Sequence, residues 1–162
     1  MSEDCVMPEP SPEHALIQES VGVWDVKCRF FMGPDSPPGE MDATDTISAI
    51  GPYWNAGRFE GDFMGMPFIG ASQFGYLPEE KCYVSTWIDA MSTFLFVLKG
   101  NMDDATKTLH MTGEGPNPST GEMVPQRVSH EFFSDNSHKM SMFMTTEHGE
   151  VKSFEMDYAR RS

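Results

Sequence analysis

From Gly22 to its end, the chain alternates apolar and polar residues with a period of two. Successive side chains of a β-strand point to opposite faces, so this pattern predicts strands, each with one apolar face. No long helical pattern separates the runs, which argues against a parallel sheet. The runs are 23–31, 41–50, 53–62, 67–76, 81–89, 93–99, 107–113, 124–133, 138–145 and 151–158. We therefore expect an all-β fold of about ten antiparallel strands, with a hairpin turn at Asn101-Met102-Asp103-Asp104.

The first part of the chain differs from the rest. Residues 1–10 are polar and contain Pro, and we expect a flexible tail there. Ser11-Pro12-Glu13 then predicts a helix start, because Ser caps free amides and Pro suits the first turn. Gly22 is expected to end this short helix. No linker divides the remainder, so residues 11–162 are predicted to form a single domain.

Composition excludes several partners. The 162 residues carry a net charge of −14, which disfavours nucleic acids and anionic membranes. No apolar run approaches the ~20 residues that a membrane-spanning helix needs. Three Cys without a C-x-x-C pair indicate reduced thiols, and the N-terminus lacks the basic and apolar regions of a signal peptide. We expect a cytoplasmic protein.

Short motifs narrow the fold. The tripeptide Gly22-Val23-Trp24 after a short helix resembles the opening of lipocalin-like (calycin superfamily) barrels. The central motifs resemble an uncharacterised family of lipocalin-like domains of unknown function, a likeness that extends from about Pro12 to Tyr158. They are Gly57-Arg58-Phe59, Gly65-Met66-Pro67-Phe68-Ile69-Gly70, Gly75-Tyr76, Tyr83, Trp87-Ile88-Asp89 and Ser92-Thr93.

This resemblance implies an antiparallel up-and-down β-barrel. In such barrels the short N-terminal helix closes one end and the Trp packs inside at the base. A closed barrel also leaves no exposed strand edge, unlike a sandwich. The resemblance implies no activity.

Two charged residues on aromatic-rich strands are the first candidates for a ligand site. Arg58 shares a strand face with Trp54, and Asp89 shares one with Tyr83 and Trp87. If these faces point inward, an Arg–carboxylate pair could orient a polar head group, with Arg58 as the anchor. If they point outward, the same charges form a surface ion pair.

Further candidates lie on two later strands. Met140 and Met142 alternate along one face, and Met side chains adapt to irregular apolar cavities. His130 lies on an apolar face, where it could bond to a neighbour or ligate haem iron, as in the nitrobindin-like relatives of this superfamily. His110, His138 and His148 are interpreted as surface residues. No H-E-x-x-H or C-x-x-C spacing indicates a metal site.

The sequence favours binding over catalysis. Its large content of Phe, Met, Trp and Tyr predicts a barrel that holds a small apolar or amphipathic molecule, of unknown identity and with no cofactor indicated. The alternatives are an enzyme using Asp89 or His130, a haem-binding barrel and a purely structural or dimerisation module. A homodimer is expected because residues 93–99 are apolar on both faces, with Leu95 and Val97 on the outer one.

Overall fold

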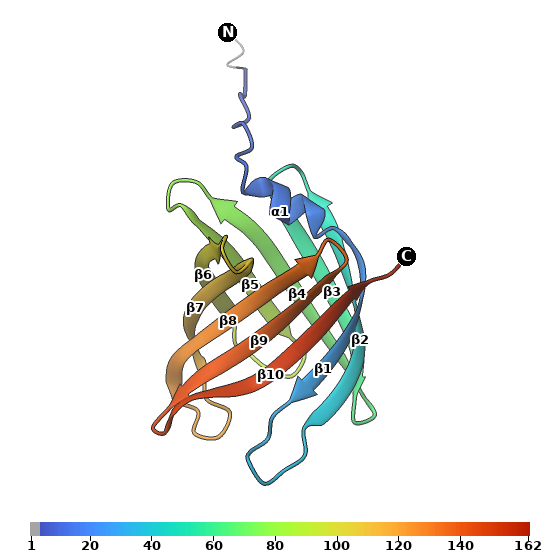
Figure 1. The fold of residues 1–162 in the computed structure, drawn as a ribbon, viewed down its shortest axis with the longest axis vertical. Coiled ribbons are helices and arrows are strands. Elements are labelled where there is room, and N and C mark those ends of the chain that lie inside the picture. Colours follow the sequence, from blue (N-terminus) through green and yellow to red (C-terminus); the bar gives the residue numbers. More distant parts are fainter. Residues whose placement is uncertain (1–3) are drawn as a thin grey trace.

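The computed structural model describes residues 4–162, which form one short helix and ten antiparallel strands closed into a barrel (Figure 1). Each strand pairs with its neighbours in the sequence, and the first pairs with the last. The elements are α1 (His14–Glu19), β1 (Gly22–Phe30), β2 (Gly39–Ile50), β3 (Trp54–Phe63), β4 (Met66–Leu77), β5 (Cys82–Asp89), β6 (Phe96–Asp103), β7 (Thr108–Pro116), β8 (Met123–Ser134), β9 (Ser137–Thr146) and β10 (Gly149–Arg160). The predicted up-and-down barrel is confirmed.

One strand begins and ends later in the chain than the sequence predicted. The sequence pattern indicated a strand over residues 93–99 and a turn at Asn101, but β6 runs from Phe96 to Asp103. Asn101 and Met102 pair with His110 and Leu109 of β7. Asn is common in turns, and the register with β7 overrides that preference here.

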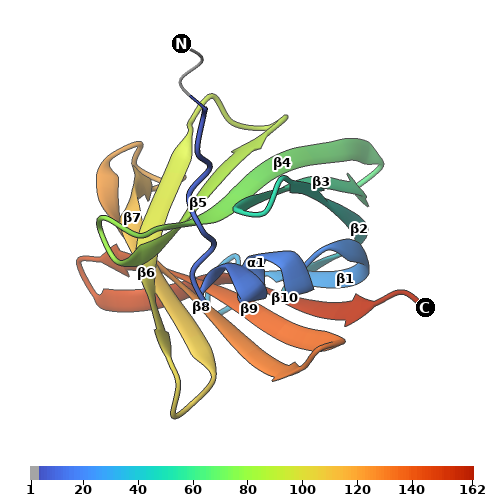
Figure 2. The ribbon, with the colours of Figure 1, turned by 90° about the horizontal axis from the view of Figure 1, so that it is seen from above.

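The helix lies over one end of the barrel (Figures 1 and 2). Ile17 is fully buried, and its carbonyl accepts a hydrogen bond of 2.8 Å from the Asn55 side chain of β3. Ser11 does not cap the helix as predicted. Instead, its amide and hydroxyl both lie within 3.0 Å of Nδ1 of the buried His14.

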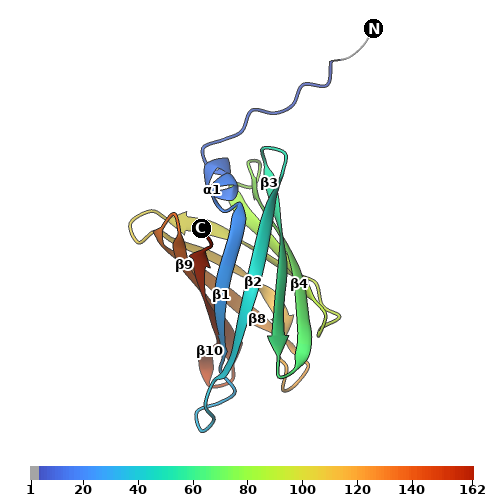
Figure 3. The ribbon, with the colours of Figure 1, turned by 90° about the vertical axis from the view of Figure 1, so that its right-hand side faces the viewer.

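Trp24 packs inside the barrel beneath the helix, as the resemblance implied. Its indole nitrogen donates to the Ser20 carbonyl at 3.0 Å, and its ring lies 4.3 Å from the Arg160 guanidinium. Residues 4–10 lead away from this end without regular secondary structure, while residues 1–3 of the predicted tail lie outside the described part of the chain (Figure 3).

Two groups of buried side chains face each other across the barrel. One is centred on Trp24, Phe59 and Met156, and the other on Ile17, Leu109 and Met111. Met140 and Phe154 contact both. Among residues 4–162, no helix has the length and apolar character needed to cross a membrane.

Candidate functional site: a cavity inside the barrel

A cavity of about 520 Å³ lies between the two core groups. It extends from Ser20 and His138 near α1 to Met91 and Pro118 in the loops of the opposite end. Inward-facing residues of most strands form its wall, because every second side chain of a closed barrel points inside. Its apolar lining includes Phe30, Phe68, Phe74, Trp87, Phe96, Leu98, Leu109, Met111, Val128, Phe132, Met140, Met142, Phe154 and Met156.

Trp87 and Asp89 occupy the inner face of β5 and line the cavity. Of the two orientations that the sequence left open for this strand, the inward one therefore occurs. The indole nitrogen of Trp87 donates to Asp89 Oδ2 at 2.9 Å, and the Met91 amide donates to Oδ1 at 2.9 Å. The Trp87 ring lies so close to Gly70 that a Cβ there would come within 2.3 Å of it. Gly70 therefore makes room for the indole.

Arg58 and Trp54 do not reach the cavity, so the hypothesis of an internal Arg58 anchor is wrong. Phe59 is fully buried inside, and strand alternation consequently turns Arg58 and Trp54 outward. The Arg58 side chain is 63% exposed and forms an ion pair of 2.7 Å with Glu60, its neighbour on the same outer face. Trp54 covers Gly75 of β4 on that face.

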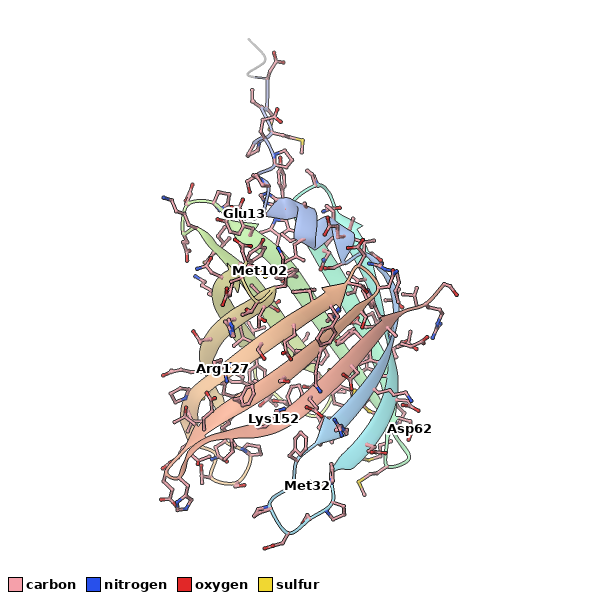
Figure 4. All side chains as sticks on the ribbon, viewed as in Figure 1. Glu13, Met32, Asp62, Met102, Arg127 and Lys152 are labelled. Carbon is pink, nitrogen blue, oxygen red and sulfur yellow. The ribbon has the colours of Figure 1, made fainter. Side chains whose placement is uncertain are left out.

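Tyr83 faces inward but lies outside this cavity. It stacks on Phe74, and its hydroxyl donates to the Glu13 carbonyl at 3.3 Å. It lines a second hollow of about 790 Å³ beside α1. Glu13 and Met102 of this hollow lie at the α1 end of the molecule, and Met32 and Asp62 lie at the other end (Figure 4).

His130, Met140 and Met142 line the cavity as predicted. His138 was interpreted as a surface residue, and that interpretation is wrong: it is buried and also lines the cavity. Its ring stacks on Tyr158 at 4.3 Å and lies 6.0 Å from the ring of His130. Removal from water lowers the pKa of His130 to about 4 and that of His138 to about 3, so both imidazoles are neutral at pH 7.

Asp45 is the polar residue that sequence reasoning missed. It lies on the inner face of β2, is 5% exposed and lines the cavity. The Tyr158 hydroxyl donates to Oδ2 at 3.4 Å, whereas Oδ1 has no hydrogen-bond partner within residues 4–162. Burial raises the pKa of Asp45 to about 6. The carboxylate is thus held in a costly environment beside an apolar space.

A position without a side chain lies next to this carboxylate. A Cβ at Gly57 would come within 2.9 Å of Asp45 Oδ1 and 2.6 Å of Ser72 Oγ. The Ser72 hydroxyl, which also lines the cavity, therefore lies near the carboxylate. Gly57, Ser72 and Asp45 form what we call the Asp45 niche.

The family model described as "Protein of unknown function (DUF1579)" matches residues 9–160, which is nearly the whole chain. The chain belongs to this family. No curated protein matches its sequence. For this DUF1579 protein, the resemblance noted in the central motifs is thereby confirmed.

Two solved structures resemble the DUF1579 barrel over almost its whole length. The crystal structure of Rv2717c from M. tuberculosis has a TM-score of 0.69 and 13% identity, covering 95% of this chain and 100% of that one. The S-type phycobiliprotein lyase CPES from Guillardia theta has a TM-score of 0.65 and 11% identity, covering 96% and 99%. At these identities, the likeness shows a shared fold.

Proposed function

We propose that this protein binds one small apolar or amphipathic molecule in the cavity inside its barrel. The cavity of about 520 Å³ carries this proposal. Small-molecule sites are concave, largely apolar and fitted with a few polar groups, and this lining combines aromatic and Met side chains with Asp45, Ser72 and His130. An apolar guest is favoured there over water, because most of the wall offers water no hydrogen bonds.

The structural neighbours support the barrel as a scaffold. The Guillardia theta protein is named as a phycobiliprotein lyase, and this name describes that protein alone. Binding by this chain is inferred from its own cavity. A cytoplasmic location stays a prediction from composition, to be checked by cell fractionation.

Titration with the uncharged probe N-phenyl-1-naphthylamine tests the proposal. We expect a saturable rise in probe fluorescence with one site per chain. Met140→Trp, which fills the cavity, should weaken binding by at least about tenfold, whereas Phe143→Trp on the outer face of the same strand should not. Thermal unfolding confirms that both variants fold. No saturable binding, or equal binding by Met140→Trp, would contradict the proposal.

A second candidate is an iron porphyrin ligated by His130. The imidazole of His130 faces the cavity and is neutral, which is the form that binds iron. Addition of haemin should then give a shifted Soret band that His130→Phe abolishes and that His110→Phe, on the exposed outer face, retains. An unshifted Soret band excludes this candidate.

Catalysis by Asp89 or His130 is the other alternative. Both side chains line the cavity, where general acid–base groups would meet a bound molecule. Chemical change of a co-purified molecule, followed by mass spectrometry and lost in Asp89→Asn or His130→Phe, would favour this alternative over binding alone.

A further inference from the structure

The charges that face the cavity are not balanced. Asp45 and Asp89 line it, and no Lys or Arg of residues 4–162 does. Both oxygens of Asp89 already accept hydrogen bonds, from Trp87 and Met91. Asp45 accepts one long bond from Tyr158, and its Oδ1 accepts none from the described residues. The unmet requirement of the cavity is therefore a hydrogen-bond donor at Asp45.

The surroundings of Asp45 suit a cation better than a neutral donor. A carboxylate removed from water is stabilised most by a partner of opposite charge that also donates hydrogen bonds. The hydroxyl of Tyr158 contacts it, and aromatic rings line the same cavity. The faces of aromatic rings attract an ammonium group. The hydroxyl of Ser72, on the other side of Gly57, adds an acceptor to the same part of the cavity wall.

We propose that the Asp45 niche binds the ammonium group of an amphipathic amine whose apolar body fills the cavity. This amine binding rests on the proposed function, which is the binding of a small molecule in the cavity. This reverses the polarity that the sequence suggested, since an anchoring Arg58 would have selected a carboxylate or phosphate. The Asp45 carboxylate accepts a hydrogen bond from the ammonium, and the Met and aromatic wall contacts the hydrocarbon part.

The opening beside α1 has the same charge preference. The hollow of about 790 Å³ there shares Ser20, Phe132 and His138 with the cavity, so the two spaces adjoin. Its charged lining consists of four carboxylates and two cations: Glu13, Glu19, Asp104, Asp135, Lys107 and Arg160. Together with a net charge of −14, this lining attracts a cation towards the barrel and repels an anion.

Competition among octylammonium, octanol and octanoate tests the inference, since the three share one apolar body. Each is titrated below its micelle concentration against the protein loaded with N-phenyl-1-naphthylamine. We expect octylammonium to bind about tenfold or more tightly than octanol, and octanoate to bind most weakly. Asp45→Asn should weaken octylammonium binding by about thirtyfold and leave octanol within about threefold.

Asp42→Asn is the matched control. Asp42 lies on the same strand as Asp45 but on its exposed outer face, so this change removes the same charge without altering the cavity. Circular dichroism and thermal unfolding establish that both variants fold.

The pH dependence provides an independent readout. The ionisable groups near Asp45 are Tyr158 of β10, His138 of β9 behind it and Cys28 of β1. None of the three ionises between pH 5 and 8, because burial raises the pKa of Tyr158 and Cys28 and lowers that of His138. Octylammonium affinity should thus fall as pH decreases through about 6, where free Asp45 becomes protonated. Octanol affinity should stay flat.

The outcomes separate the two proposals. If none of the three ligands and no neutral probe binds, the proposed function fails. If octanol and the probe bind while octylammonium shows no advantage, or keeps its affinity in Asp45→Asn, only the amine inference is overturned. Equal losses for octanol and octylammonium in Asp45→Asn would also overturn it, because the carboxylate would then act by maintaining the cavity.

Discussion

A single buried carboxylate makes the protein less stable than it could be. The pKa of Asp45 is raised by burial from 3.8 to about 6, so the folded state binds this proton more tightly than the unfolded state. The contribution of this proton to the free energy of unfolding is fully present below pH 3.8 and is lost as pH rises through about 6. The loss is on the order of 3 kcal/mol. A neutral isostere avoids this loss.

Asp45→Asn should accordingly raise the free energy of unfolding at pH 7 by up to about 2 kcal/mol, with the gain disappearing near pH 4. Thermal or urea unfolding of both proteins at several pH values measures it. His130 and His138, whose lowered pKa values reduce stability as pH falls below 6.5, act in both proteins and cancel in the difference. Asp42→Asn should show no such trend, and a destabilised Asp45→Asn at pH 7 would contradict the argument.

The polar residues of the cavity were predictable only in part. His138 precedes Met140 and Met142 by whole periods of two, and Asp45 follows Met41 and Ala43 in the same way. Alternation alone thus placed both inside. Residue type argues the other way, because polar residues are rarely buried. Arg58 could not be oriented, since its strand carries aromatics on both faces.

At the level of elements, one side chain fastens the helix to the closing strand. Arg160 at the end of β10 donates to the carbonyls of Glu19 and Val21, at 2.5 and 2.6 Å, and to that of Asp135, at 3.0 Å. Glu19 is the last residue of α1 and Val21 follows it closely, and unpaired carbonyls at a helix C-terminus favour a cation. Arg160 therefore joins α1, β10 and the β8–β9 turn.

Replacing this side chain should loosen the helix more than the barrel. We expect Arg160→Met to cost about 2 kcal/mol in unfolding free energy and to speed amide hydrogen exchange in α1. The neighbouring Arg161→Met removes only exposed contacts with Asp25 and Thr44 and should cost under about 1 kcal/mol. Equal effects of the two substitutions would show that Arg160 does not hold the helix.

The elements themselves followed closely from the sequence. Hydrophobic alternation and turn residues predicted ten strands, and ten occur within residues 4–162. The error at β6 arose where Asn101 and Asp103 suggested a turn inside a strand whose position is set by pairing with β7. Local preference cannot report a register fixed by another strand.

For the whole molecule, the outer surface of β4, β5, β6 and the residue just before β6 carries exposed apolar side chains. They are Ile69, Ile88, Leu95 and Val97. Copies with a charge of −14 repel one another, so we expect any self-association to use such an uncharged patch. The closed sheet offers no free edge for strand pairing, which leaves side-chain contact.

Light scattering should accordingly give twice the 18.2 kDa chain mass at micromolar concentration. Ile88→Lys should yield single chains, whereas Ile50→Lys, at an equally exposed Ile on β2, should not (51% and 53% exposed). A mass of one chain for the unaltered protein would refute the dimer.

The size of the cavity is also a property of the whole molecule. It depends on how ten strands tilt and pack together, which no local sequence pattern encodes.

The pairing of β1 with β10 also governs when the molecule can be completed. During synthesis, β1 and β2 leave the ribosome before β10. The edge of β1 that pairs with β10 is then unpaired, and the apolar side chains of β1, Trp24, Val26 and Cys28, lack their neighbours on that side. That edge stays unpaired until residues 154–160 emerge, well over a hundred residues after β1. Contacts so distant in the chain form slowly, and an open apolar edge is prone to aggregate in the meantime. A nascent chain stalled before β10 would therefore depend on chaperones, however complete its other nine strands.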